Sequence, residues 1–232
     1  MCLLLFYRYL YPMFFPIGDT NVQGGYKPIF SYSLIAVNIL IFIYQFSLGT
    51  NVDPFVYEYA AIPDEISRGE DYFTLFTSMF LHGGWMHLIG NMVFLWIFAD
   101  NIEATIGSAL FIVFYILGGL AGAAAHIVTD LHSQIPTIGA SGAISAVMGA
   151  YLVMFPKSKI KVIAVFFVFW MPAVIFLVLW FGQQALSGIG ELSATTDEGG
   201  TAWWAHIGGF VFGVICGLYF RRYKKPEVPD YV

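Results

Sequence analysis

Residues 203–220 read WWAHIGGFVFGVICGLYF and decide the class of fold. This stretch contains no Asp, Glu, Lys or Arg, and it is long enough to cross a bilayer as a helix, which needs roughly 20 residues. The chain is 59% hydrophobic and 11% charged, so as a water-soluble domain it would expose large apolar patches. Five further apolar stretches are found at 29–48, 85–104, 109–131, 140–156 and 160–183. We therefore expect an all-α, polytopic membrane protein.

The six stretches predict a six-helix membrane domain over residues 29–220. The preceding segment, 1–28, begins apolar, but Arg8, Pro12 and Pro16 interrupt it before it could span a bilayer. It has no basic start and no small-residue cleavage site, so we expect no removable signal. The segment 221–232 follows the last helix as a basic tail.

The basic residues orient the predicted bundle. If the N-terminus is cytoplasmic, nine of the ten Lys and Arg residues fall on the inner side and only Arg68 lies outside. The nine are Arg8, Lys27, Lys157, Lys159, Lys161, Arg221, Arg222, Lys224 and Lys225. Both termini are then cytoplasmic, and the tail favours anionic lipid over nucleic acid as its partner. With no organelle-targeting segment, the expected location is a prokaryotic cytoplasmic membrane.

Two polar residues are expected at the same depth in the bilayer. Ser141 begins the fourth apolar helix within Gly139–Gly142, 16 residues before Lys157, and His206 precedes Arg221 by 15 residues. At about 1.5 Å per residue, both lie about 22 to 24 Å above the inner face. Polar side chains at this depth are costly and indicate a functional site. Ser141 and His206 are a candidate nucleophile and base.

A second polar pair lies on the second helix. His87 and Asn91 are four residues apart and share one helix face. Donors of these types stabilise a developing negative charge in an oxyanion hole. The N–H of Ser141, at a helix N-terminus, is a third candidate donor.

Small residues predict how the fourth and sixth helices approach each other. They recur every four residues, as Ser141, Ser145 and Gly149 on one helix and as Gly209, Gly213 and Gly217 on the other. Such stripes allow close helix packing in membranes, and packing alone would also explain them. Here the stripes would also bring Ser141 toward His206.

These residues resemble the motifs of the rhomboid intramembrane serine proteases. The resemblance rests on Gly139-Ala140-Ser141-Gly142, on Ala205-His206-Ile207-Gly208-Gly209 with Gly213, and on His82 followed by His87-Leu88-Ile89-Gly90-Asn91. It covers roughly residues 29–220. It implies a Ser141–His206 dyad without an acidic third member, an oxyanion site with His87 and Asn91, and no cofactor. It also implies transmembrane protein substrates, cut near their outer ends, and a structural role for Glu103 on the cytoplasmic side.

Three positions differ from patterns common in that family. A frequent Trp-Arg pair before the second helix is replaced by Tyr72-Phe73-Thr74, which bears on the conformation of the loop. Some members carry a tyrosine one turn after the nucleophile, packed on the catalytic histidine, where this chain has Ser145. An aromatic gate residue found in some members is Gly90 here.

Other functions are weaker alternatives. An inactive rhomboid-like scaffold would not need both dyad residues. A small transporter would need a polar path to the inner face, but helices four to six are apolar below Ser141. No His-Glu-x-x-His or Cys-x-x-Cys spacing predicts a metal site, and we expect His82 to order the outer loop. The sequence gives no indication of the oligomeric state.

Overall fold

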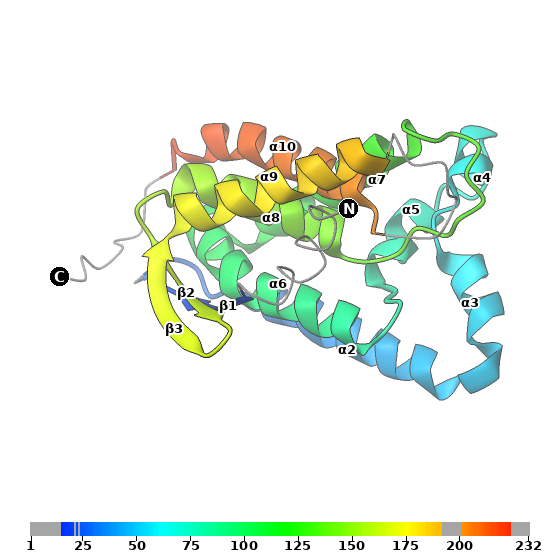
Figure 1. Ribbon diagram of the computed structural model, residues 1–232, viewed down its shortest axis with the longest axis horizontal. Coiled ribbons are helices and arrows are strands. Elements are labelled where there is room, and N and C mark those ends of the chain that lie inside the picture. Colours follow the sequence, from blue (N-terminus) through cyan, green and yellow to red (C-terminus); the bar gives the residue numbers. More distant parts are fainter. Residues whose placement is uncertain (1–14, 21, 23, 192–200, 224–232) are drawn as a thin grey trace.

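The computed structural model describes residues 15–20, 22, 24–191 and 201–223, and this part of the chain is mostly helical. Its long helices are α2 (Ile29–Ser47), α6 (Trp85–Ile106), α7 (Ser108–Ile127), α8 (Ser141–Met154), α9 (Ala173–Glu191) and α10 (Trp203–Phe220). Short helices join α2 to α6, namely η1 (Gly49–Asn51), α3 (Val52–Tyr59), α4 (Pro63–Ser67), α5 (Thr74–Thr77) and η2 (Ser78–Phe80). They gather at one end of the bundle, opposite a small sheet (Figure 1).

Four helices in the described part of the chain are long and apolar enough to cross a membrane. They are α2, α7, α10 and the Ala173–Gly190 stretch of α9. Helix α8 has 14 residues, about 21 Å at 1.5 Å per residue, which is shorter than a hydrocarbon core of about 30 Å. Helix α6 is long but carries Asp100 and Glu103. The chain is therefore a membrane protein, as its composition predicts.

The expectation of one helix over 160–183 is wrong, and so is a purely helical fold. Strands β2 (Lys159–Ala164) and β3 (Phe167–Pro172) form a hairpin, and α9 begins only after Pro172. Strand β1 (Phe15–Asp19) pairs antiparallel with β2, which gives the order β1-β2-β3. When nearly every residue of a run is apolar, the hydrophobic periodicity does not distinguish a strand from a helix. The alternation of Lys159 and Lys161 with Ile160 and Val162 marks a strand, because successive side chains of a strand point to opposite faces.

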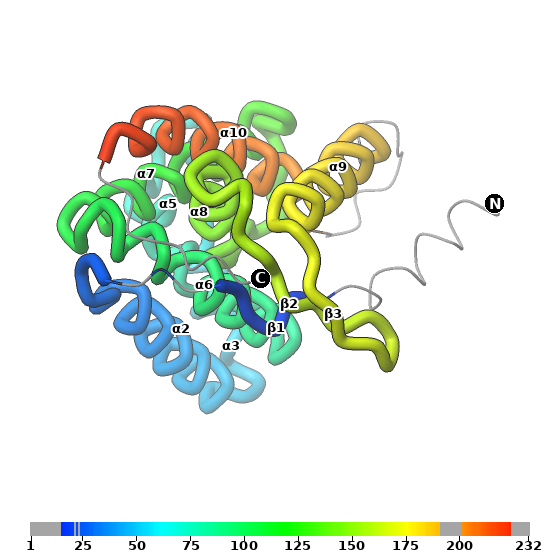
Figure 2. The backbone as a smooth tube through the Cα atoms, turned by 90° about the vertical axis from the view of Figure 1, so that its left-hand side faces the viewer, coloured from blue at the N-terminus to red at the C-terminus, as the bar shows by residue number. Residues whose placement is uncertain are grey.

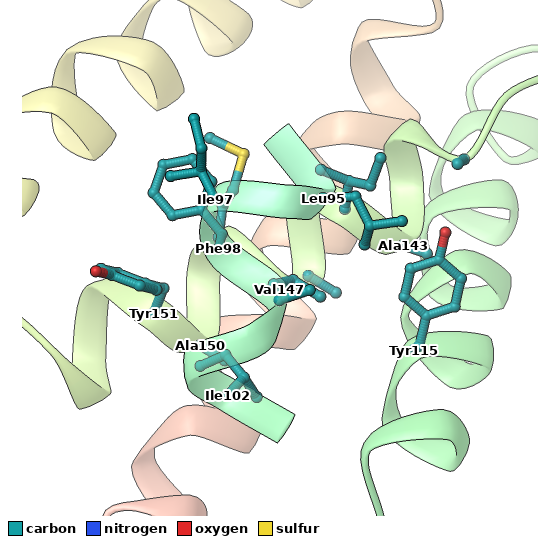
Figure 3. Packing of buried hydrophobic residues seen from close by; sticks show 14 of the residues in the cluster. Leu95, Ile97, Phe98, Ile102, Tyr115, Ala143, Val147, Ala150 and Tyr151 are labelled. Atoms are coloured by element: carbon teal, nitrogen blue, oxygen red, sulfur yellow. The ribbon is translucent and has the colours of Figure 1, made fainter. Parts of the chain in front are cut away.

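Helix α8 occupies the centre of the bundle. It contacts α6, α7, α9 and α10, which surround it when the molecule is viewed from the sheet end (Figure 2). All residues from Gly142 to Tyr151 are buried. Its side chains meet the buried face of α6, where Val147 and Tyr151 pack near Leu95 and Phe98 (Figure 3).

The predicted close approach of the fourth and sixth helices is confirmed between α8 and α10. A Cβ atom at Gly209 would overlap the carbonyl oxygen of Gly142, and one at Gly213 would overlap that of Ala146. On the other side of the contact, a Cβ at Gly149 would overlap the carbonyl oxygen of Phe210. Small residues therefore let the two backbones touch.

A polar network joins α6 to the N-terminal part of the chain near the sheet. The buried Glu103 carboxylate accepts bonds from the N–H groups of Phe30 and Ser31, at 2.9 and 2.7 Å, and from the Ser31 hydroxyl at 2.7 Å. These N–H groups belong to the first turn of α2, which lacks intrahelical acceptors for them. Glu103 thus stabilises the start of α2. Most of segment 1–28, all of the tail beyond residue 223 and residues 192–200 lie outside the described residues.

Candidate active site

Ser141 is the first residue of α8, at the end of an extended segment held by the outer loops. Thr137 pairs with Ala61 through two backbone hydrogen bonds of 2.9 and 3.1 Å, and the N–H of Gly139 donates to the carbonyl of Ser78 at 2.9 Å. Gly139 adopts a φ of +123°, a conformation that favours glycine. The glycine thus allows the chain to turn sharply into the helix at Ser141.

His87 and Asn91 lie directly against this turn. A Cβ atom at Gly139 would be 2.7 Å from Nε2 of His87 and 3.6 Å from Nδ2 of Asn91. Nδ1 of His87 accepts a hydrogen bond from the N–H of Gly83 at 3.3 Å. A neutral imidazole carries one proton, so Nε2 of His87 bears it and points a donor at the start of α8.

His82 belongs to the same cluster through a bond to Asn91 that the sequence analysis did not predict. Nδ2 of Asn91 donates to Nε2 of His82 at 3.0 Å, and His82 is buried. Burial lowers the pKa of His82 to about 4, aided by the nearby His87, so its ring is neutral and accepts this bond. His82 fixes the amide of Asn91, a more specific role than the expected ordering of the outer loop.

His206 projects from the first turn of α10 toward α9. Its Nδ1 atom lies 2.8 Å from Oε1 of Gln184, and the Gln184 side chain is buried with 2% exposure. The rings of Trp180 and Trp203 also contact the imidazole, with centroids at 6.0 and 6.1 Å. The sequence analysis did not identify Gln184, because nothing in a lone glutamine of an apolar helix indicates its partner.

The contact between α8 and α10 places the segments that carry Ser141 and His206 side by side. Gly142 on α8 contacts Gly209 on α10. One turn before Gly209 on α10, the carbonyl oxygen of Ala205 lies 3.7 Å from where a Cβ atom of residue 142 would be. Ser141 and Ala205 also line a common cavity of about 30 Å³, together with Ser78 and Thr137. That volume accommodates a water molecule beside polar groups.

The structure shows the surroundings of the three positions that differ from patterns common in the family. Ser145 has no aromatic ring to stack on the imidazole, and its hydroxyl donates to the carbonyl of Ser141 at 2.6 Å. The loop without the arginine is held at Thr74, whose hydroxyl donates to the carbonyl of Asp71 at 2.7 Å. A Cβ at Gly90 would contact no atom within 4 Å, so this position is open.

Among the described residues, no group of three or more His, Cys, Asp or Glu side chains converges in a way that suits a metal ion. The chemistry available at the start of α8 is that of a hydroxyl, imidazoles, amides and backbone N–H groups.

Comparison with known proteins identifies the family. A family model described as the rhomboid domain matches residues 69–223. The chain is 37% identical over 132 residues to rhomboid protease GluP of Bacillus subtilis, covering 56% of this chain and 25% of that protein. It is 26% identical over 196 residues to the mitochondrial Rhomboid protein 1 of Saccharomyces cerevisiae, covering 82% of this chain and 53% of that protein. It thus spans between about a quarter and about half of the length of these relatives. The chain belongs to the rhomboid family.

Proposed function

We propose that this protein is an intramembrane serine endopeptidase that uses a Ser141–His206 dyad. The observation that carries the proposal is the meeting of three elements at one point. Gly139, two residues before Ser141, lies against His87 and Asn91 of α6, while the first turn of α8 packs on the turn of α10 that carries His206. A nucleophile, a base and anion donors are the parts that acyl transfer needs.

In the proposed reaction, Oγ of Ser141 attacks the carbonyl carbon of a substrate peptide bond while Nε2 of His206 takes its proton. The negative charge that develops on the carbonyl oxygen accepts hydrogen bonds from His87, Asn91 and an N–H at the start of α8. His206 then gives the proton to the leaving amine, and water hydrolyses the acyl-enzyme. The small cavity beside Ser141 is a suitable reservoir for that water.

We further propose that α2, α6, α7, α9 and α10 cross the membrane, and that the shorter α8 crosses it together with the submerged segment before Ser141. Both termini then lie on the cytoplasmic side. The charge distribution supports this orientation. Lys27 precedes α2, Lys159 and Lys161 lie on β2, and Arg221 follows α10, all toward the sheet end, whereas Arg68 lies in the loops beyond α4 at the opposite end. The proposed location is a prokaryotic cytoplasmic membrane; of the two relatives named above, one is from a bacterium and the other is mitochondrial.

The substrates in this proposal are membrane-spanning segments of other proteins, cut near their outer boundary. Ser141 begins α8 at the end of the bundle that carries α3 to α5, away from the basic sheet end. A peptide bond inside a helix cannot present its carbonyl to Oγ without local unwinding, so helix-weakening residues are expected at the cut.

The replacement Ser141→Ala tests the proposal. It removes the attacking oxygen and little volume, so cleavage of a single-span substrate in liposomes and labelling by a fluorophosphonate should both be lost. Ser145→Ala is the matched control one turn along α8, and it should keep most of the activity. Wild-type turnover in Ser141→Ala would overturn the serine mechanism. Mass spectrometry of wild-type products should place the cut at the outer boundary.

A further inference from the structure

Gln184 is a buried amide on a helix made otherwise mainly of apolar residues. It lies on α9, with the sequence AVIFLVLWFGQQALSGIGE. A buried amide without a partner costs several kcal/mol in an apolar environment, so such groups are nearly always hydrogen-bonded. Here Oε1 of Gln184 is 2.8 Å from Nδ1 of His206.

This contact determines which nitrogen of His206 carries the proton. An amide oxygen can only accept, so Nδ1 of His206 donates to it. A neutral imidazole has one proton, which leaves the lone pair on Nε2, the atom that a base directed at Ser141 needs. His87 has the opposite arrangement, because its Nδ1 accepts from the N–H of Gly83.

Two aromatic contacts to His206 also come from α9 and the start of α10. Trp180, one turn before Gln184, lies over the imidazole with an interplanar angle of 34°, and Trp203 contacts it edge-on at 88°. The hydroxyl of Ser145 on α8 donates to the backbone carbonyl of Ser141 in its own helix.

We propose that Gln184 is the positioning residue of the dyad, holding His206 in the tautomer with a free Nε2 and fixing the orientation of its ring. The proposal rests on the proposed function of His206 as the base. In the structure, Gln184 stands where an acidic third member would stand in a triad. Unlike an Asp or Glu side chain at this place, the Gln184 amide carries no charge, so no charge has to be buried in the bilayer.

The replacements Gln184→Met and Gln184→Glu separate positioning from packing. Methionine keeps the length of the side chain but accepts no comparable bond, so both tautomers are populated and kcat should fall by about 10- to 100-fold with little change in KM. Glutamate restores an acceptor and should recover most of this loss. Its charge favours the protonated imidazole, so the acid limb of the pH–rate profile should move to higher pH. Gln183→Met, the adjacent residue on α9, is the control and should retain wild-type kcat.

Within the described part of the chain, the titratable groups whose charge acts on His206 are His87 of α6 and His126 of α7, and both are unchanged in these variants. If the pH–rate profile shifts only in Gln184→Glu, the shift is therefore caused by the new carboxylate. Wild-type kcat in Gln184→Met, or an unshifted profile in Gln184→Glu, would overturn the proposal.

Nitrogen NMR of histidine-labelled protein tests the tautomer without any turnover. The chain has five histidines, and the His206 signals are assigned by their loss in His206→Ala. We expect a protonated Nδ1 in the wild type and in Ser141→Ala, and loss of this preference in Gln184→Met. A protonated Nε2 in the wild type would overturn the proposal. If Ser141→Ala keeps its turnover while Nδ1 is protonated, the proposed function fails and the Gln184 contact stands.

Discussion

At the scale of single residues, hydrogen bonds at Nδ1 determine which nitrogen carries the proton in His87 and in His206, and the two rings differ in this respect. His87 accepts at Nδ1 from a backbone N–H and so presents a proton at Nε2, toward Gly139. His206 donates at Nδ1 to Gln184 and so keeps a lone pair at Nε2. One side chain is therefore suited to stabilise an anion and the other to remove a proton.

The replacements His87→Ala and Asn91→Ala test this division. Each removes one proposed oxyanion donor, and the loss of one such donor lowers kcat by about 10²- to 10³-fold in serine proteases. We expect losses of that order in liposome assays, with the protein still folded. His206→Ala should lower turnover further and also abolish fluorophosphonate labelling, because Ser141 then has no proton acceptor.

His132→Ala is the control for these histidine changes, because its side chain is 89% exposed and lies in the loop after α7. It should retain wild-type turnover. Unchanged turnover in both His87→Ala and Asn91→Ala would contradict the assignment of these two residues as oxyanion donors. The dyad is tested separately by Ser141→Ala and His206→Ala.

The sequence could predict the residues of the candidate site that share a depth or a helix face. Ser141 and His206 follow from counting residues to the inner charges, and His87 with Asn91 from a spacing of four. Gln184 and His82 could not be found in this way. Their partners lie 22 and 9 residues away in the sequence, on elements whose relative rotation no local pattern encodes.

At the scale of elements, the contact of α8 with α10 sets the geometry that the site requires. Gly213 lies two turns beyond His206, where a Cβ would overlap the carbonyl of Ala146. Gly213→Ala should therefore push the two helices apart. Overpacking of this kind costs about 1 to 3 kcal/mol. We expect a lower Tm and a fall in kcat, although residue 213 touches neither member of the dyad.

Gly182→Ala on α9 provides the matched control, because a Cβ there would meet no atom within 4 Å. Alanine favours a helix over glycine by about 1 kcal/mol, so this variant should be at least as stable as the wild type. Equal Tm values for the two variants would mean that the backbones of α8 and α10 are not in contact.

The elements also show where sequence patterns are insufficient. Five of the six expected helices occur within a few residues of their predicted bounds, because long apolar runs bounded by charges, glycine or proline are distinctive. The remaining run, 160–183, contains most of the β2–β3 hairpin and the first half of α9. Its strands are apolar at nearly every position after Lys161, so the change of period at Pro172 is hidden.

At the scale of the whole molecule, buried polar residues tie the N-terminal strand to the helical bundle near the sheet. Oδ2 of Asp19 on β1 accepts hydrogen bonds from Nδ2 of Asn101 on α6 and from the hydroxyl of Tyr151 on α8. Asn101 also accepts from the N–H of Val22 at 2.7 Å. These bonds hold the start of the described chain against the two helices that carry Asn91 and Ser141.

The pH dependence of stability should report this junction. Burial, opposed by the bond from Tyr151 and reinforced by the nearby Asp100, raises the pKa of Asp19 from 3.8 to about 7. The folded protein therefore binds this proton more tightly than the unfolded chain. The stabilisation from Asp19 is complete below about pH 4 and is lost as the pH rises toward about 7. Asp19→Asn imitates the protonated form and should remove this loss.

The measurement is the difference between the Tm of Asp19→Asn and that of the wild type, followed from pH 4 to pH 8. This difference isolates Asp19, because His82, with a pKa lowered to about 4, has an opposing effect that is common to both proteins. The difference should grow in favour of Asp19→Asn up to about pH 7 and then level off. Asp53→Asn, at an exposed site on α3, should give no such trend. A difference that stays constant across this range would mean that Asp19 is already ionised in its half-buried position, with the two donors sufficient to stabilise the charge.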